Sequence, residues 1–175
     1  MIGLFRRNPD REAAASAYRS VVEHARRPVF FTECGIPDTL DGRFELICLH
    51  AFLYLHRLKS EDAQGAAIGQ RFFDAMFVDF DRSLRELGTG DLSVGRKIKQ
   101  MAEAFYGRIS AYERGLAGGG DGELHASLRR NLFGHAAADD AQVARMAAYL
   151  RAEIARLRDR PAAALLAGAV DFGLP

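Results

Sequence analysis

His50 is the side chain of this sequence best placed for titratable chemistry. It lies in an apolar segment of helical character, and seven-residue steps place Arg43, His50 and Arg57 along one face of that helix. Such a face could bind an acid or a haem propionate. The alternative is structural: His50 is hydrogen-bonded inside the fold, and the arginines pair with acids of a neighbouring helix, namely Asp74, Asp79 or Asp81.

Sequence motifs for metal binding and catalysis are missing. There is no Glu-x-x-His pair, no His-Glu-x-x-His, no phosphate-binding loop and no Gly-x-Ser-x-Gly. Asp171-Phe172-Gly173 copies a kinase tripeptide by chance, because the glycine-rich and catalytic loops are absent. Cys48 and His50 are two residues apart and diverge on a helix, so they make poor joint ligands. We therefore expect no metal, no cofactor and no enzymatic activity.

Arg96, Lys97 and Lys99 form a basic cluster near the start of a predicted helix. A helix N-terminus already carries positive partial charge, so these cations need compensation. Acidic groups of a partner could supply it. Asp91 and Glu103, or solvent, are the structural alternative.

Tyr106, Gly107 and Arg108 interrupt an otherwise regular helical pattern. Phe105 occupies the buried stripe, so Tyr106 and Arg108 project to its sides. Gly107 costs about 1 kcal/mol of helix propensity and suggests a close approach. The approaching group is a neighbouring helix or, since tyrosine and arginine are enriched in binding hot spots, a ligand or a partner peptide.

Composition limits the remaining possibilities. A chain of 175 residues with 49% hydrophobic residues is long enough for one core. The net charge of +1 gives no general reason to expect nucleic acid as a partner, and we expect no DNA binding. Two cysteines, Cys34 and Cys48, are too few for a disulfide framework and are expected to be reduced thiols. Since neither a secretory signal nor a membrane-spanning segment is apparent, we expect a soluble, cytoplasmic protein.

Apolar residues recur at intervals of three and four, which predicts an all-α fold. We expect a single-domain bundle of about six helices over residues 1–175, with a flexible N-terminus at 1–8 and a C-terminal turn and tail at 161–175. The expected helices are about 10–26, 42–59, 62–87, 91–116, 123–133 and 139–158, followed by a short turn at 162–167. Residues 29–32 are expected to be an extended connector between the first two helices. Asp91 or Ser93 is expected to cap the fourth helix.

Three separated groups of residues carry a family resemblance. They are Gly35, Pro37, Asp38, Asp41, Gly42, Arg43, Phe44 and His50; Asp81, Leu84, Arg85, Gly88, Asp91 and Lys97; and Phe105, Tyr106, Gly107, Arg108 and Tyr112. In this combination the sequence resembles the ubiquinol cytochrome c reductase chaperone family, in its short bacterial form. The resemblance covers nearly the whole chain and is strongest from Pro28 to Tyr112.

The resemblance implies a non-catalytic assembly factor. Its expected client is newly made cytochrome b, or another subunit of respiratory complex III. Mitochondrial relatives act near the ribosome with a small partner protein, and both of those contacts stay open for this chain. The segment 2–7, with Ile2, Leu4 and Phe5 before two arginines, could touch the inner face of the cytoplasmic membrane peripherally. Two other functions remain open: a haem-binding or quinone-binding bundle with a cavity near His50, and a ribosomal RNA binder using the basic cluster.

We expect nine residues to form the client-binding surface: Arg43, His50, Asp81, Arg85, Asp91, Lys97, Tyr106, Arg108 and Tyr112. Four of them should converge if the second and fourth long helices pack side by side, namely Arg43, Asp91, Tyr106 and Arg108.

Overall fold

A computed structural model describes residues 8–118, 120–134 and 136–175. The elements are α1 Pro9–Ala25, α2 Val29–Thr32, α3 Leu40–Leu58, α4 Asp62–Glu86, α5 Asp91–Ala117, α6 Gly122–Leu128, the π-helical turn η1 Arg129–Phe133, α7 Asp140–Arg158 and α8 Ala162–Leu166. The all-α prediction is confirmed, and each long helix begins and ends within two residues of its expected bounds. Apart from Asn8, the predicted flexible N-terminus lies outside the described residues.

The extended connector predicted at residues 29–32 is wrong, because Val29–Thr32 forms the helical turn α2. Pro28 has helical backbone angles, and its carbonyl accepts from the amides of Phe31 and Thr32, each at 2.9 Å. The bulky, β-prone residues suggested an extended backbone, yet the segment is helical and Phe30 is fully buried in the core. Tertiary burial therefore decided the conformation of this segment over its β-propensity.

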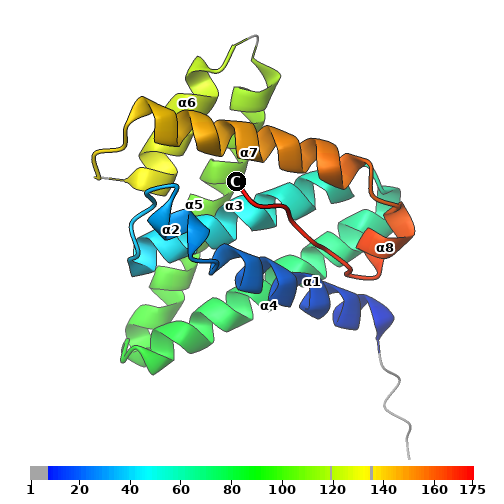
Figure 1. Cartoon of the computed structure of the whole chain (residues 1–175). Coiled ribbons are helices and arrows are strands. Elements are labelled where there is room, and N and C mark those ends of the chain that lie inside the picture. The colour runs from blue at the N-terminus through cyan, green and yellow to red at the C-terminus, as the bar shows by residue number, and fades with distance from the viewer. Residues whose placement is uncertain (1–7, 119, 135) are drawn as a thin grey trace, which may run out of the picture.

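Helix α3 is the centre of the molecule and contacts α1, α4, α5 and α7 (Figure 1). Thr39 caps it, since its hydroxyl oxygen accepts from the amide of Gly42 at 3.1 Å. The loop before α3 folds back so closely that a Cβ at Gly42 would lie 2.0 Å from the carbonyl oxygen of Pro37. Glycine at this position is therefore required by the turn that precedes the central helix.

Helices α4 and α5 form a long antiparallel hairpin. Gly88 ends α4 with φ +81°, the left-handed conformation expected for a closing glycine. Gly90, not Asp91 or Ser93, occupies the N-cap of α5, so the predicted capping residue is wrong. Asp91 is the first residue of α5 and binds a side chain of α4 instead, as described below.

The C-terminal segment returns across the bundle between α1 and α7 (Figure 1). Val170 and Phe172 are buried there, and the amide of Gly173 donates to the Glu153 carboxylate at 3.0 Å. Both cysteines are free and buried, as expected. Within the described ranges, no helix is long and apolar enough to cross a membrane.

Candidate functional site

Arg108, in the middle of α5, binds Glu45 near the start of α3. The Arg108 Nε donates to Glu45 Oε2 at 2.6 Å, a second guanidinium nitrogen donates to Oε1, and the third donates to the carbonyl of Ala104 at 2.8 Å. The guanidinium also lies 5.5 Å from the centre of the Phe44 ring. Only 20% of the Arg108 side chain and 7% of the Glu45 side chain are exposed. This bidentate pair therefore joins α5 to the central helix in a largely dry environment.

Burial raises the pKa of the Glu45 carboxyl above its ordinary value, and the bound Arg108 guanidinium opposes that rise. Taking both charges out of water is costly, and the pairing offsets that cost only while both partners are present. The pair is thus a poor candidate for a contact that opens to receive a client.

Tyr106 lies on the outside of α5. Its ring stacks on Phe73 of α4, with ring centres 5.5 Å apart and planes at 29°, and 57% of the residue is exposed. A Cβ added at Gly107 would meet no atom within 4 Å. The predicted close approach of a neighbouring helix at Gly107 is therefore wrong, and the glycine faces open space. We call Phe73, Tyr106 and Gly107 the Tyr106 surface.

Arg43 is exposed at the start of α3. Its Nε donates to Asp38 in the preceding turn at 2.7 Å, and its guanidinium lies 5.6 Å from the centre of the Phe31 ring. Arg57, at the other end of α3, pairs with Glu61 and donates to the carbonyl of Leu157. The predicted pairing of these arginines with acids of α4 is wrong, because each binds an acid close to it in sequence.

Four predicted residues meet where α4 turns into α5, a region we call the α4–α5 corner. Arg85 bridges Asp81 at 2.6 Å and Asp91 at 2.5 Å, and Lys97 donates to the hydroxyl of Thr89 at 3.4 Å. The pairing with Arg85 lowers the pKa of Asp81. Two apolar side chains of this corner are exposed, namely Leu87 and Leu92. Glu103 and Asp91 were predicted to compensate the charge of the basic cluster. Glu103 does so, since it lies 3.9 Å from Lys99, whereas Asp91 pairs with Arg85 instead.

His50 and Tyr112 are fully buried, so placing them on a client-binding surface is wrong. His50 Nδ1 donates to the carbonyl of Leu46 at 2.7 Å, which leaves Nε2 to accept from the Tyr149 hydroxyl at 2.9 Å. His24 Nε2 lies 3.0 Å from the same hydroxyl oxygen. Because both ring nitrogens of His50 are engaged, the structure agrees with the structural alternative for this residue and gives no support to haem ligation.

The predicted convergence of Arg43, Asp91, Tyr106 and Arg108 is also wrong. Helix α5 is continuous from Asp91 to Ala117, so Asp91 and Arg108, seventeen positions apart, are separated by about 25 Å along its axis. Helices α3 and α5 are in contact, and Arg108 reaches Glu45 there, but Asp91 lies at the far end of α5. The predicted client-binding residues that are exposed therefore lie in three separate places: on the Tyr106 surface, at the α4–α5 corner, and at Arg43.

Three residues that complete these contacts were not predicted: Glu45, Phe73 and Tyr149. Glu45 had a usable signal, since a carboxylate within a helix that is apolar nearly all round must be buried with a cationic partner. Tyr149 had no such signal, because its partners His50 and His24 lie 99 and 125 residues away in sequence.

Comparison with known proteins identifies the family. The family described as "Ubiquinol-cytochrome C chaperone" matches residues 32–172. The chain belongs to this family. All nine predicted site residues lie inside the matched range, and helix α1 lies outside it. The resemblance inferred from three separated groups of residues is thus confirmed.

Proteins similar to this family member include three vertebrate relatives named ubiquinol-cytochrome c reductase complex assembly factor 1. They are from Xenopus laevis, mouse and human, and each is 28% identical over 142 residues, or 81% of this chain. The match covers 70% of the frog protein, but only 48% of the mouse protein and 47% of the human protein. The chain therefore spans about half the length of the two mammalian relatives.

A similar solved structure is the crystal structure of the Cbp3 homolog from Brucella abortus. It is 35% identical, has a TM-score of 0.83, and the superposition covers 97% of this chain and 94% of that one. The helical arrangement described above is thus shared by that solved structure.

Proposed function

We propose that this chaperone-family member binds newly made cytochrome b and assists its assembly into respiratory complex III. The family match over residues 32–172 carries this proposal, and the names of the vertebrate relatives agree with it. The client is a membrane protein, so we place the encounter at the inner face of the cytoplasmic membrane. Binding rather than catalysis is the proposed activity. Within residues 8–118, 120–134 and 136–175, no three His, Cys, Asp or Glu side chains are grouped to hold a metal.

The Tyr106 surface is the proposed client contact. Exposed tyrosine held in place by stacking offers a large, rigid apolar area at low entropic cost. Gly107 weakens α5 by about 1 kcal/mol relative to alanine, and no internal contact requires it. A partner segment that lies directly against the α5 backbone would explain why this position lacks a side chain. Leu87 and Leu92 are also exposed on this hairpin, but at the α4–α5 corner, where Leu92 lies about 21 Å along α5 from Tyr106.

Deleting the gene tests the function. In a strain that possesses complex III and no second copy of the family, we expect loss of assembled complex III with other respiratory complexes retained. Native gel electrophoresis and the reduced cytochrome b spectrum measure this. Restoring the parent gene should restore complex III, while Tyr106→Ala should restore it only in part. Normal complex III in the deletion strain would end the proposal.

Replacing Gly107 with glutamine separates binding from folding. Gln is the better helix former and its Cβ meets no neighbour, so we expect the free energy of unfolding to rise by roughly 0.5 kcal/mol. Recovery of cytochrome b with the tagged protein should fall, because the new side chain occupies the client's place. Gly95→Gln is the matched control, since Gly95 lies on the same helix and also faces open space.

The control variant should gain the same stability and keep its client. If Gly107→Gln retains cytochrome b as well as Gly95→Gln does, the Tyr106 surface is not the contact, and the α4–α5 corner becomes the next surface to test.

A further inference from the structure

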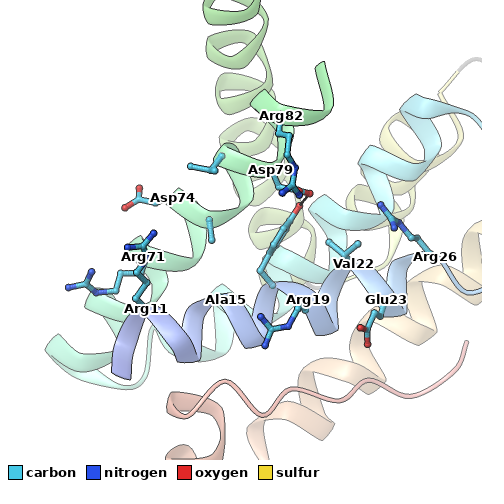
Figure 2. Close-up of a pocket in the computed structure, with 13 residues that line it drawn as sticks. Arg11, Ala15, Arg19, Val22, Glu23, Arg26, Arg71, Asp74, Asp79 and Arg82 are labelled. Carbon is cyan, nitrogen blue, oxygen red and sulfur yellow. Dashed lines mark hydrogen bonds and ion pairs between the residues drawn. The ribbon is translucent and has the colours of Figure 1, made fainter. Parts of the chain in front are cut away.

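A groove of about 810 Å³ opens between α1 and α4, on a face that none of the nine predicted residues occupies. Figure 2 shows Arg11, Arg19 and Arg26 along the α1 side, with Arg71 and Arg82 on the α4 side. Small apolar side chains also line the groove: Ala15, Val22 and Ala75 are partly buried in it, and Val78 is exposed. The groove therefore combines an apolar floor with arginine-rich rims.

The two walls are fixed to each other before any ligand arrives. The Tyr18 hydroxyl donates to Asp79 of α4 at 2.8 Å, and Arg82 also pairs with Asp79. Burial raises the pKa of Tyr18, and the hydrogen bond to Asp79 raises it further, so the hydroxyl stays protonated as a donor. Arg71 reaches Asp10 of α1 at 4.0 Å. A preformed groove loses less entropy on binding than one that must be assembled.

The groove carries a local surplus of positive charge. Five arginines line it against three acids, Glu23, Asp74 and Asp79. Arg82 pairs with Asp79 and with Glu86, and Arg71 pairs with Asp10, so the surplus rests on the three arginines of α1. Arg11, Arg19 and Arg26 are exposed and form no ion pair with any residue that the structure describes. Since the whole chain carries a net charge of only +1, this surplus is a property of one face. Anionic groups of a partner would be attracted to it.

The spacing of the three arginines without an ion pair, Arg11, Arg19 and Arg26, suits pairing with a second helix. They are eight and seven residues apart on α1, so they lie about 12 and 10 Å apart along its axis and span about 22 Å. A second helix lying along the groove can place acidic side chains at the same intervals of eight and seven residues. Its apolar stripe would then face the floor, as in other complexes that bind a helix in a groove.

We propose that this groove binds an amphipathic helix of a protein partner whose acidic side chains follow one edge of its apolar stripe. A flat anionic membrane fits less well, because the groove is concave and its own acids Glu23 and Asp74 would face the lipid phosphates. The site is independent of the Tyr106 surface. Its α1 wall also lies outside the residues that match the family.

A designed peptide tests the proposal on the full chain. The probe is a helix of roughly 20 residues, about 30 Å long, with Glu at intervals of eight and seven beside a Leu and Ala stripe. Fluorescence anisotropy should show saturable binding that weakens as salt is added. A peptide of the same composition in scrambled order should bind at least about tenfold more weakly, since it presents no continuous apolar stripe.

Charge reversal locates the site. Arg11→Glu, Arg19→Glu and Arg26→Glu combined should weaken peptide binding at least about tenfold. The matched control combines Arg96→Glu, Lys99→Glu and Arg130→Glu, which changes the net charge equally at exposed positions outside the groove. This control should keep the parent's affinity. Equal loss in both triple variants, or no preference for the ordered peptide, overturns the proposal.

Sedimentation with vesicles containing phosphatidylglycerol tests whether the groove binds a membrane surface instead of a protein helix. If the groove variant loses vesicle sedimentation that the control variant retains, and neither binds the peptide, the arginines serve a membrane surface and the protein-helix proposal is wrong. Peptide binding that depends on the groove arginines, with vesicle sedimentation equal in both variants, supports it.

Discussion

Arg108→Ala is expected to lower the free energy of unfolding by about 3–5 kcal/mol, because it leaves the Glu45 carboxylate buried without its partner. Arg43→Ala is expected to change it far less. Arg43 is half exposed, and its pair with Asp38 is exposed as well. Both arginines are among the residues that carry the family resemblance, so urea unfolding of the two variants tests whether burial or a shared family role sets the cost of the substitution.

Two further measurements identify the unpaired carboxylate as the cause. Adding Glu45→Gln to Arg108→Ala should recover part of the loss, since a neutral amide costs less to bury than a charge. The cost of Arg108→Ala alone should also be smaller at pH 5 than at pH 8. Burial already raises the pKa of Glu45, and without Arg108 the carboxyl can bind a proton at mildly acid pH. If Arg108→Ala unfolds like Arg43→Ala at both pH values, Arg108 does not serve the fold.

The helices could be predicted from sequence because their signal is local. The apolar stripe of α5, from Val94 to Tyr112, repeats at three and four residues, and Gly88 marks the end of α4 through its own backbone preference. The prediction for Val29–Thr32 was wrong because four residues are too few to show a period that separates extended backbone from a helical turn. What decided it was burial of Phe30 against residues far along the chain.

The candidate site could be predicted only in part, for a related reason. Spacing put Tyr106 and Arg108 on opposite sides of the buried Phe105, and both do project there. Whether a projecting side chain meets a partner or solvent depends on the neighbouring helix, which spacing does not describe. Thus the Arg108 side chain pairs with Glu45, whereas Gly107 faces open space. Helical register predicts direction, and tertiary packing decides exposure.

Mild acid is expected to destabilise the fold through the buried pair His50 and His24. Burial lowers the pKa of His50 to about 3 and that of His24 to about 4, from an ordinary value of 6.5. His50 lies among Phe30, Phe172, His24 and Tyr149, and its Nε2 accepts the Tyr149 proton. Protonating His50 replaces that acceptor with a donor facing the Tyr149 hydroxyl, which His24 also approaches, so the charged form is disfavoured by burial and loses this hydrogen bond.

The direction in which stability changes with pH follows from the difference between the folded and unfolded pKa values. Both folded-state pKa values lie below the unfolded value, so the stability from keeping these rings neutral is fully present above pH 6.5. It is lost as the pH falls from 6.5 toward about 3 to 4. At pH 5 His50 alone should cost about 2 kcal/mol, at about 1.4 kcal/mol per pH unit, and His24 adds in the same direction. Glu45 and Glu153, whose pKa values are raised by burial, act oppositely and stabilise the fold as they bind protons.

Urea unfolding of the parent and of His50→Gln between pH 7 and pH 5 isolates the histidine contribution from that of the carboxylates. Gln keeps an acceptor for Tyr149 and a donor for the Leu46 carbonyl but does not titrate, so the variant should lose about 2 kcal/mol less than the parent over this range. Glu45→Gln is the control and should keep at least the parent's loss, because it removes only an opposing group. Equal losses in the parent and His50→Gln would show that the buried imidazole does not set the acid sensitivity of this fold.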